Sequence, residues 1–169
     1  MTYELKTIST EAIPEATAKA DWYRLLNEPG EAESICRDVL VVDPADQTAL
    51  RLLGLAITDQ FTGAASDRRA EAEATFQSLQ DPYERLYYAG IVRERFAKAQ
   101  LSAGRPPHTL IVLFEDALKW FEEAEKVRPP GNDESILRWN RCVRILKNLA
   151  VPDRDREHAH FEPADSPPV

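Results

Sequence analysis

The sequence predicts an all-α protein built from antiparallel helix pairs. Apolar residues return at intervals of three and four along the body of the chain, as a helix with one buried stripe requires. Only six glycines occur in 169 residues, and stop signals made of Gly, Pro, Asn and Asp fall at regular places. A chain of this length with 43% hydrophobic residues can bury the core of one domain or of one short repeat array.

These signals divide the chain into seven predicted helices. In chain order they are 13–27, 31–42, 45–60, 65–80, 82–102, 107–127 and 133–149. The start of the fifth is well supported, because Asp81 offers an N-cap acceptor and Pro82 suits the first helical position. The stretch 109–114 has a strand-like composition, but it runs into a helical period and has no second strand to pair with. It is therefore interpreted as part of the sixth helix.

Charge is distributed unevenly around the predicted helical domain, 13–149. The net charge is −8, and residues 1–50 hold ten acids against four bases, whereas residues 51–150 hold fourteen acids and fifteen bases. After a short N-terminal extension, 1–12, the domain ends in a segment, 150–169, with five acids, two bases and four prolines. That composition is typical of a disordered acidic tail.

Composition also excludes several classes of protein. An acidic chain without a concentrated Lys/Arg run is a poor nucleic-acid binder. The longest apolar stretches, 39–42 and 110–114, are far shorter than the roughly 18 residues that cross a bilayer, and no signal peptide is evident, so we expect a cytoplasmic protein without membrane insertion. Cys36 and Cys142 lie far apart in helical segments and are expected to be buried free thiols.

No constellation in the sequence predicts catalysis. His108 lies in a turn, and no histidine stands beside a Cys, Ser or carboxylate at the spacing of a known motif. Glycine-rich phosphate loops, GxSxG and HExxH are absent from the sequence. His158 and His160 would give at most weak metal chelation from a flexible tail. We therefore expect a protein that is not an enzyme and has no cofactor or metal site.

A pattern of small, apolar or aromatic, and proline residues recurs along the helix pairs. Its members are Ala20, Tyr23, Ala32, Cys36, Val39 and Pro44 in the first unit, Leu50, Leu53, Gly54, Ile57, Ala70 and Pro82 in the second, and Leu86, Ala89, Gly90, Ala117, Phe121, Ala124 and Pro129 in the third. The small residues let two helices approach closely, the aromatic fills the space between them, and the proline ends the unit. This pattern resembles the tetratricopeptide repeat (TPR) family over about residues 13–149.

The resemblance implies a short right-handed superhelix of about three repeats, closed by a capping helix at 133–149. It also implies that the first helix of each pair lines a concave groove for a peptide or helix of a protein partner. The residues expected to face that groove are Arg24, Arg51, Leu55, Tyr87, Ile91, Arg95, Arg141 and Arg144. Arginines suit an acidic peptide or a C-terminal carboxylate. The alternative is that each arginine pairs with a neighbouring acid such as Glu94 or Glu134.

The last predicted helix carries a basic surface. Arg138, Arg141, Arg144 and Lys147 recur every three residues. One interpretation is a capping helix that keeps its outer face soluble. The other is a docking surface for an acidic partner or for this chain's own tail, 153–162.

The sequence thus predicts a cytoplasmic, non-catalytic adaptor or scaffold that is a monomer or a weak homo-oligomer. A small chaperone similar to the TPR-type secretion chaperones is one alternative. A self-assembling structural subunit, with Leu55 and Ile91 at the interface between copies, is another. No nucleic-acid partner is expected.

Overall fold

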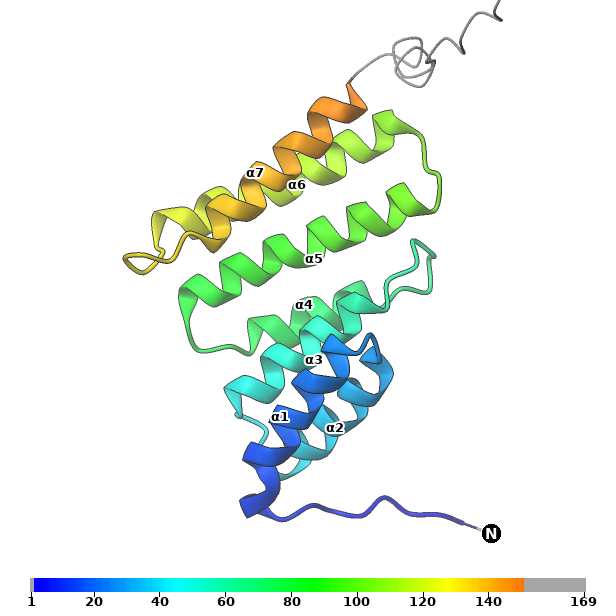
Figure 1. Ribbon diagram of the computed structural model, residues 1–169, viewed down its shortest axis with the longest axis vertical. Helices are drawn as coiled ribbons and strands as arrows, with labels where there is room; N and C mark the ends of the chain where they lie inside the picture. Colours follow the sequence, from blue (N-terminus) through cyan, green and yellow to red (C-terminus); the bar gives the residue numbers. More distant parts are fainter. Residues whose placement is uncertain (1, 151–169) are drawn as a thin grey trace, which may run out of the picture.

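The computed structural model describes residues 2–150, and this part of the chain is all-α, as predicted. A short 3-10 turn, Thr10–Ala12, precedes the first helix. The helices are α1 (Ile13–Leu25), α2 (Pro29–Val42), α3 (Gln47–Asp59), α4 (Arg69–Gln77), α5 (Pro82–Ser102), α6 (Pro107–Lys126) and α7 (Glu134–Leu149) (Figure 1). The predicted acidic tail, apart from Ala150, lies outside the described residues.

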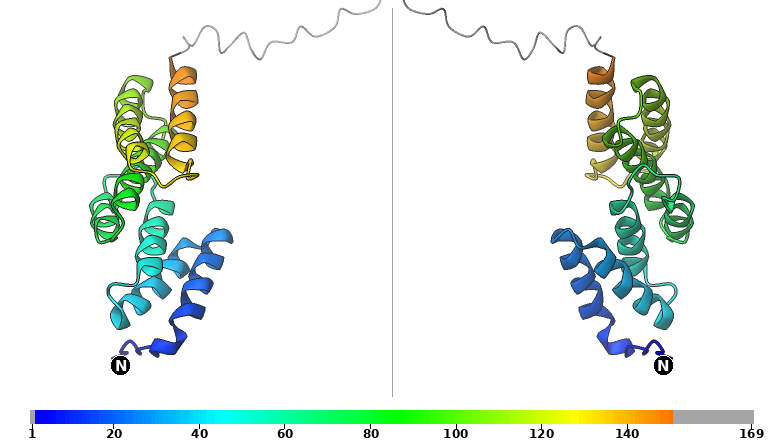
Figure 2. Two further views of the ribbon diagram at one scale, coloured as in Figure 1. Left: turned by 90° about the vertical axis from the view of Figure 1, so that its left-hand side faces the viewer. Right: turned by 90° about the vertical axis from the view of Figure 1, so that its right-hand side faces the viewer.

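Consecutive helices pack against one another along the stack. In addition, α1 contacts α3, and α3 contacts α5, so that these three helices form a continuous layer. Seen from the side, α1 at one end and α7 at the other project in the same direction from the stack (Figure 2). We call the surface formed by α1, α3, α5 and α7 on that side the inner face.

The observed helices begin and end within two residues of the predicted positions, except for α4. The sequence predicted 65–80, but α4 is shorter at both ends, and its later start is explained by the polar loop that precedes it. The Asp67 carboxylate accepts hydrogen bonds from the backbone N–H of Thr62 (3.0 Å) and of Gly63 (2.8 Å). This loop conformation, with Gly63 at φ +83°, competes with helix formation until Arg69. At α5 the predicted cap is confirmed, because the side chain of Asp81 accepts the N–H of Tyr83 at 2.9 Å.

Two glycines allow very close contact between paired helices. A Cβ atom at Gly54 in α3 would lie 2.5 Å from the ring of Phe76 in α4, and a Cβ at Gly90 in α5 would lie 2.5 Å from the ring of Phe121 in α6. Both phenylalanines are completely buried. The rings therefore occupy space that any larger residue would fill, and each glycine sets the distance between its two helices.

The register of the middle pair differs from the sequence interpretation at one residue. Ala70, assigned to the repeated pattern, is exposed, whereas Ala72 is completely buried one turn before Phe76. Ala72 and Phe76, four positions apart, lie on the side of α4 that packs against α3, and Ala70 does not. Cys36 and Cys142 are buried and free, as predicted.

We predict that Gly54→Ala destabilises the protein, although alanine is the better helix former. The added methyl group collides with the Phe76 ring, and overpacking of this kind costs about 1–3 kcal/mol, which exceeds the gain of about 1 kcal/mol in helix propensity. Urea unfolding followed by circular dichroism measures the change.

Gly30→Ala in α2 is the matched control, because nothing lies within 4 Å of its Cβ position. This variant is expected to be neutral or more stable. Equal free energies of unfolding for the two alanine variants would contradict the close contact between Gly54 and Phe76.

Candidate functional site

Three open pockets follow one another along the inner face. The first, of about 380 Å³, lies between α1, α3 and α5. Its apolar lining includes Leu52, Leu55 and Tyr88, and its polar lining includes Arg24 and Arg51. The structure therefore brings three of the predicted groove residues, Arg24, Arg51 and Leu55, to one pocket, together with Tyr88, which the sequence interpretation did not select.

The two arginines of the first pocket already have carboxylate partners. Arg24 Nε donates to Asp59 Oδ2 at 2.8 Å, and Arg51 Nη1 donates to Glu84 Oε1 at 2.7 Å. Each pair joins two helices, since Arg24 lies on α1, Arg51 and Asp59 on α3, and Glu84 on α5. A ligand carboxylate would have to compete with these partners, so the first pocket is less cationic than its two arginines suggest.

The second pocket, of about 370 Å³, lies where α3, α5 and α7 meet. Arg95 of α5 lies in its wall, where it donates to the Thr58 hydroxyl at 2.7 Å and to the backbone carbonyl of Leu55 at 3.2 Å, and it also pairs with Asp59. Burial lowers the pKa of the Arg95 guanidinium below its ordinary value, whereas the Asp59 carboxylate acts in the opposite direction. Arg95 therefore holds α5 against the end of α3.

The third pocket, of about 320 Å³, lies between α5 and α7. It is lined by Tyr87 from α5 and by Glu134, Leu137, Arg138 and Arg141 from α7. Sequence reasoning had noted Arg138 on the last helix without including it among the groove residues. Arg138 could have been included among the groove residues, because it lies on the same basic helix as Arg141 and Arg144.

Arg138 and the outer arginines of α7 differ in their partners. Arg138 Nη1 lies 3.6 Å from Oε1 of Glu94, which is completely buried and also pairs with Lys98. By contrast, Arg141 and Arg144 are exposed, and no carboxylate among residues 2–150 lies within ion-pair distance of either. Of the predicted groove arginines, three are thus paired and two are not.

Two predicted groove residues lie in the core instead. Ile91 is 1% exposed and packs in the cluster that includes Phe121, so it is absent from the lining of all three pockets. Tyr87 is 7% exposed and stacks on Tyr83, with its edge at the third pocket. Successive helical residues point about 100° apart, so burial of Tyr87 directs Tyr88 toward the first pocket. Helical period alone does not say which of two adjacent tyrosines is buried.

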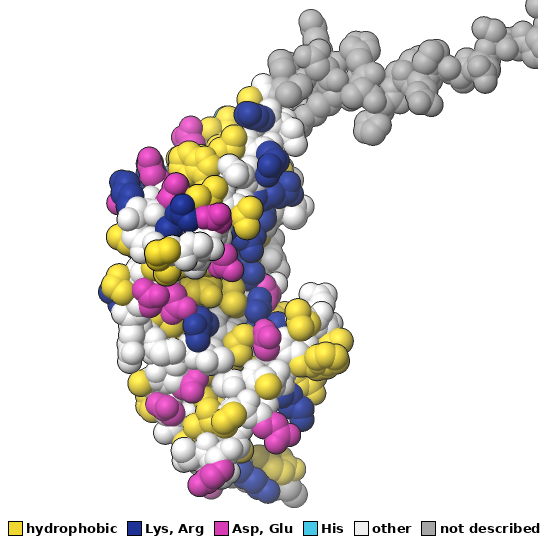
Figure 3. All heavy atoms as spheres, turned by 60° about the vertical axis from the view of Figure 1, so that its left-hand side comes forward, with side chains coloured by type: hydrophobic (Ala, Val, Ile, Leu, Met, Phe, Trp, Pro, Cys, Tyr) yellow, Lys and Arg dark blue, Asp and Glu magenta, His cyan; other side chains and the backbone are white. Residues whose placement is uncertain are grey.

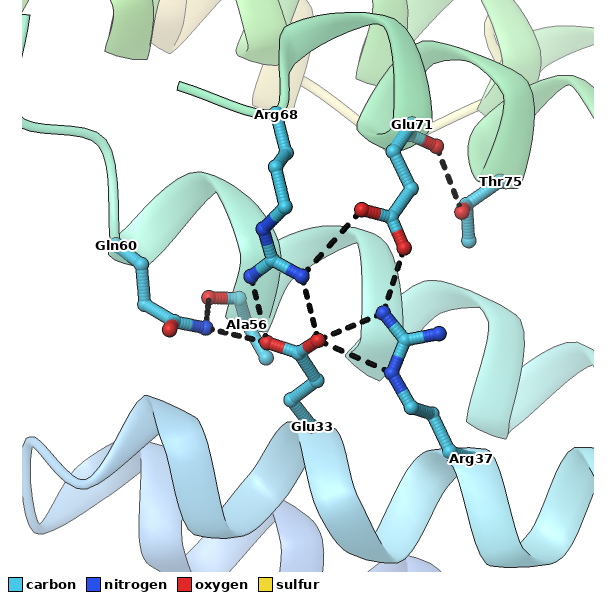
Figure 4. A network of polar contacts seen from close by, with 7 residues as sticks. All are labelled: Glu33, Arg37, Ala56, Gln60, Arg68, Glu71 and Thr75. Atoms are coloured by element: carbon cyan, nitrogen blue, oxygen red, sulfur yellow. Dashed lines mark hydrogen bonds and ion pairs between the residues drawn. The ribbon is translucent and has the colours of Figure 1, made fainter. Parts of the chain in front are cut away.

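The densest polar cluster lies away from the pockets and joins α2 to α4 (Figure 4). Glu33 of α2 accepts hydrogen bonds from Arg68 Nη1 at 2.6 Å and Nη2 at 2.7 Å. It also accepts from Arg37 Nη2 and from Gln60 Nε2, each at 2.7 Å. The Arg68 hydrogen bonds lower the pKa of the Glu33 carboxyl to about 2, against its partial burial, which raises it. Both carboxylate oxygens of Glu33 already accept hydrogen bonds from neighbouring side chains. The cluster therefore stabilises the packing of the first helix pair against the second.

In the range 2–150, no group of three His, Cys, Asp or Glu side chains is arranged to hold a metal ion. Burial raises the pKa of both the Cys36 and the Cys142 thiols to about 12, so neither is an activated nucleophile at neutral pH. None of the helices in this range combines the length and apolar character needed to cross a membrane.

The sequence matches no protein-family model, and comparisons with curated proteins and with solved structures also give no match. Function is therefore inferred from the geometry of the chain itself.

We predict that Glu33→Gln lowers the free energy of unfolding at neutral pH by about 2 kcal/mol, because charged hydrogen bonds from two arginines are weakened. The folded pKa of Glu33 lies below its unfolded value, so its stabilisation is present above about pH 5 and is lost as the pH falls toward 2. Urea unfolding at several pH values should show the wild-type and variant curves converging in acid. Glu31→Gln, on the exposed surface of the same helix, is the control. A difference that stays constant down to pH 3 would contradict this role for Glu33.

Proposed function

We propose that this protein is a TPR-type adaptor that binds a peptide or helix of a partner protein on its inner face and performs no chemistry. Its superhelix would be right-handed and would consist of three helix pairs, closed by α7. The observation that carries the binding proposal is the first pocket, where α1, α3 and α5 converge on a recess with apolar and hydroxyl groups side by side.

Repetition of the core supports the repeat assignment. In or directly after the second helix of each pair, three buried residues occur with the same spacing of four and then three, and each is at most 2% exposed. The sets are Ala32, Cys36 and Val39 in α2, Ala72, Phe76 and Leu79 at α4, and Ala117, Phe121 and Ala124 in α6. The facing first helices supply Ala20, Gly54 and Gly90. A unit repeated in this way cannot bury its own apolar face alone, which favours a stacked array.

The charges of the inner face suggest how a ligand would be oriented. At the α1 end, the arginines are neutralised by Asp59 and Glu84, so contacts there would come mainly from Leu55 and Tyr88. At the α7 end, Arg141 is exposed beside the third pocket. The proposed ligand therefore places an apolar segment in the first pocket and an acidic segment, or a terminal carboxylate, toward α7.

Self-assembly is a second candidate function, and one exposed ridge favours it. Trp22, Leu25 and Leu26 are 60%, 77% and 54% exposed, and their spacing places them along one side of the end of α1. By contrast, Ile91 is in the core and Leu55 is half-buried, so Ile91 cannot contribute to an interface between copies. Three adjacent exposed apolar side chains are typical of an interaction surface.

We predict that Ala18→Arg weakens peptide binding to the first pocket. Ala18 is exposed and lines this pocket, so an arginine there fills the space and leaves the core unchanged. Peptides selected on the wild-type protein from a displayed library are expected to bind the variant at least about tenfold more weakly, or about 1.4 kcal/mol, by calorimetry.

Ala74→Arg, at an exposed site on α4, provides the same substitution away from the pocket and should bind the selected peptides normally. Failure to select any peptide with saturable binding, or equal affinities for the two variants, would argue against the inner face as the binding site.

For the second candidate, light scattering over a range of micromolar concentrations should show species heavier than the 19.1 kDa chain. Leu25→Glu should restore the monomer, because it places a charge in the centre of the apolar ridge. A wild-type protein that remains monomeric throughout excludes self-assembly through this ridge.

A further inference from the structure

The exposed side of α7 has an excess of positive charge. Leu137, Arg141 and Arg144 are exposed, and their spacing of four and three places them on one side of the helix, with Lys147 one turn further. We call these four residues the α7 ridge. Figure 3 shows Lys and Arg side chains gathered along the half of the molecule that includes α7. The helix has four basic residues and a single acid, Glu134.

This excess is not compensated within residues 2–150. Elsewhere on the inner face, basic side chains are matched with carboxylates, as Arg24 is with Asp59 and Arg51 with Glu84. Among the described residues, no carboxylate forms a comparable ion pair with Arg141, Arg144 or Lys147. Clustered like charges repel one another, so an anionic occupant would gain both attraction and relief of this repulsion.

The chain itself supplies such an occupant immediately after α7. Residues 153–157 read Asp-Arg-Asp-Arg-Glu, and further acids follow at Glu162 and Asp165. In an extended chain, alternate side chains point to opposite sides, so the three acids of 153–157 share one side and the two arginines take the other. We propose that the segment 153–162 binds back onto the α7 ridge, with its carboxylates against Arg141, Arg144 and Lys147.

The geometry of the two segments is compatible with this contact. Successive basic residues of the ridge are about 4.5 Å apart along the helix axis, and the alternate acids of an extended chain are about 6.6 Å apart. Arg141 lies about 13 Å back from Ala150 along α7, a distance that about four extended residues cover. The acids at 153–157 therefore reach the level of the ridge without a long intervening loop.

Because the segment 153–162 is covalently attached to α7, weak contacts are enough to keep it bound to the α7 ridge. Each exposed ion pair contributes at most about 1 kcal/mol, and such pairs weaken with salt. A short tether, however, gives an effective concentration in the millimolar range, so an intrinsic Kd of about 1 mM already keeps the segment bound about half of the time. If the proposed adaptor function holds, an acidic ligand at the α7 end competes with this segment; that consequence, unlike the contact itself, rests on the proposed function.

A nitroxide spin label at His160→Cys in the full-length chain tests the contact. Cys36 and Cys142 are completely buried, so labelling is expected to be confined to the new thiol. At low ionic strength, the label should selectively reduce the amide NMR signals of residues 137–147. The signals should recover in about 1 M salt, where the Debye length is about 3 Å. Uniform loss of signal over the surface, or loss confined to other helices, would overturn the proposal.

Two matched variants separate charge pairing from mere proximity. Neutralising the segment with Asp153→Asn, Asp155→Asn and Glu157→Gln changes no residue of the folded domain, and it should restore the signals of α7 at low salt. Arg141→Gln with Arg144→Gln should do the same, whereas Lys119→Gln with Lys126→Gln on α6 should not.

Signal loss that persists in the neutralised chain would overturn the proposal. Because the measurement involves no partner, failure of peptide binding to the inner face would leave its result unaffected.

Discussion

The closeness of α3 to α4 and of α5 to α6 depends on two glycines. At Gly54 and at Gly90 the helix backbone touches a phenylalanine ring of the paired helix, at a distance that excludes even a Cβ atom. Protein interiors are packed as densely as organic crystals, so a ring in this position fixes the spacing and the rotation of both helices. Because α1, α3 and α5 then contact one another in turn, they present a common side, and the pockets of the inner face lie along it.

A second level of organisation comes from ion pairs that bridge the helix pairs. Glu33 joins α2 to Arg68 at the start of α4, and Asp59 at the end of α3 receives both Arg24 and Arg95. Around the first two pockets, Asp59 pairs with Arg24 and Arg95, and Glu84 pairs with Arg51. On the inner face of residues 2–150, Arg141 and Arg144 of α7 have no carboxylate partner, so this face becomes more cationic toward α7 although the whole chain has a net charge of −8.

Sequence reasoning succeeded where a signal is local. The cap at Asp81 and the helical period through 109–114 each act within a turn or two of helix, and both were read correctly. It failed for α4, where the Asp67 side chain stabilises a loop that the apolar period does not reveal. The repeated pattern also pointed to Ala70, whereas Ala72 is the residue that lies in the core.

The amino-acid sequence by itself determined the helices and their order, because periodicity, caps and breakers operate between neighbouring residues. Only the tertiary structure decided which side chains remain for binding. Arg24 meets Asp59 across 35 positions of the chain, and Arg95 meets the same carboxylate across 36 in the opposite direction. Such contacts depend on how the helices stack. Arg24 and Arg95 therefore join helices in the middle of the inner face, whereas Arg141 and Arg144 of α7 have no carboxylate partner within residues 2–150.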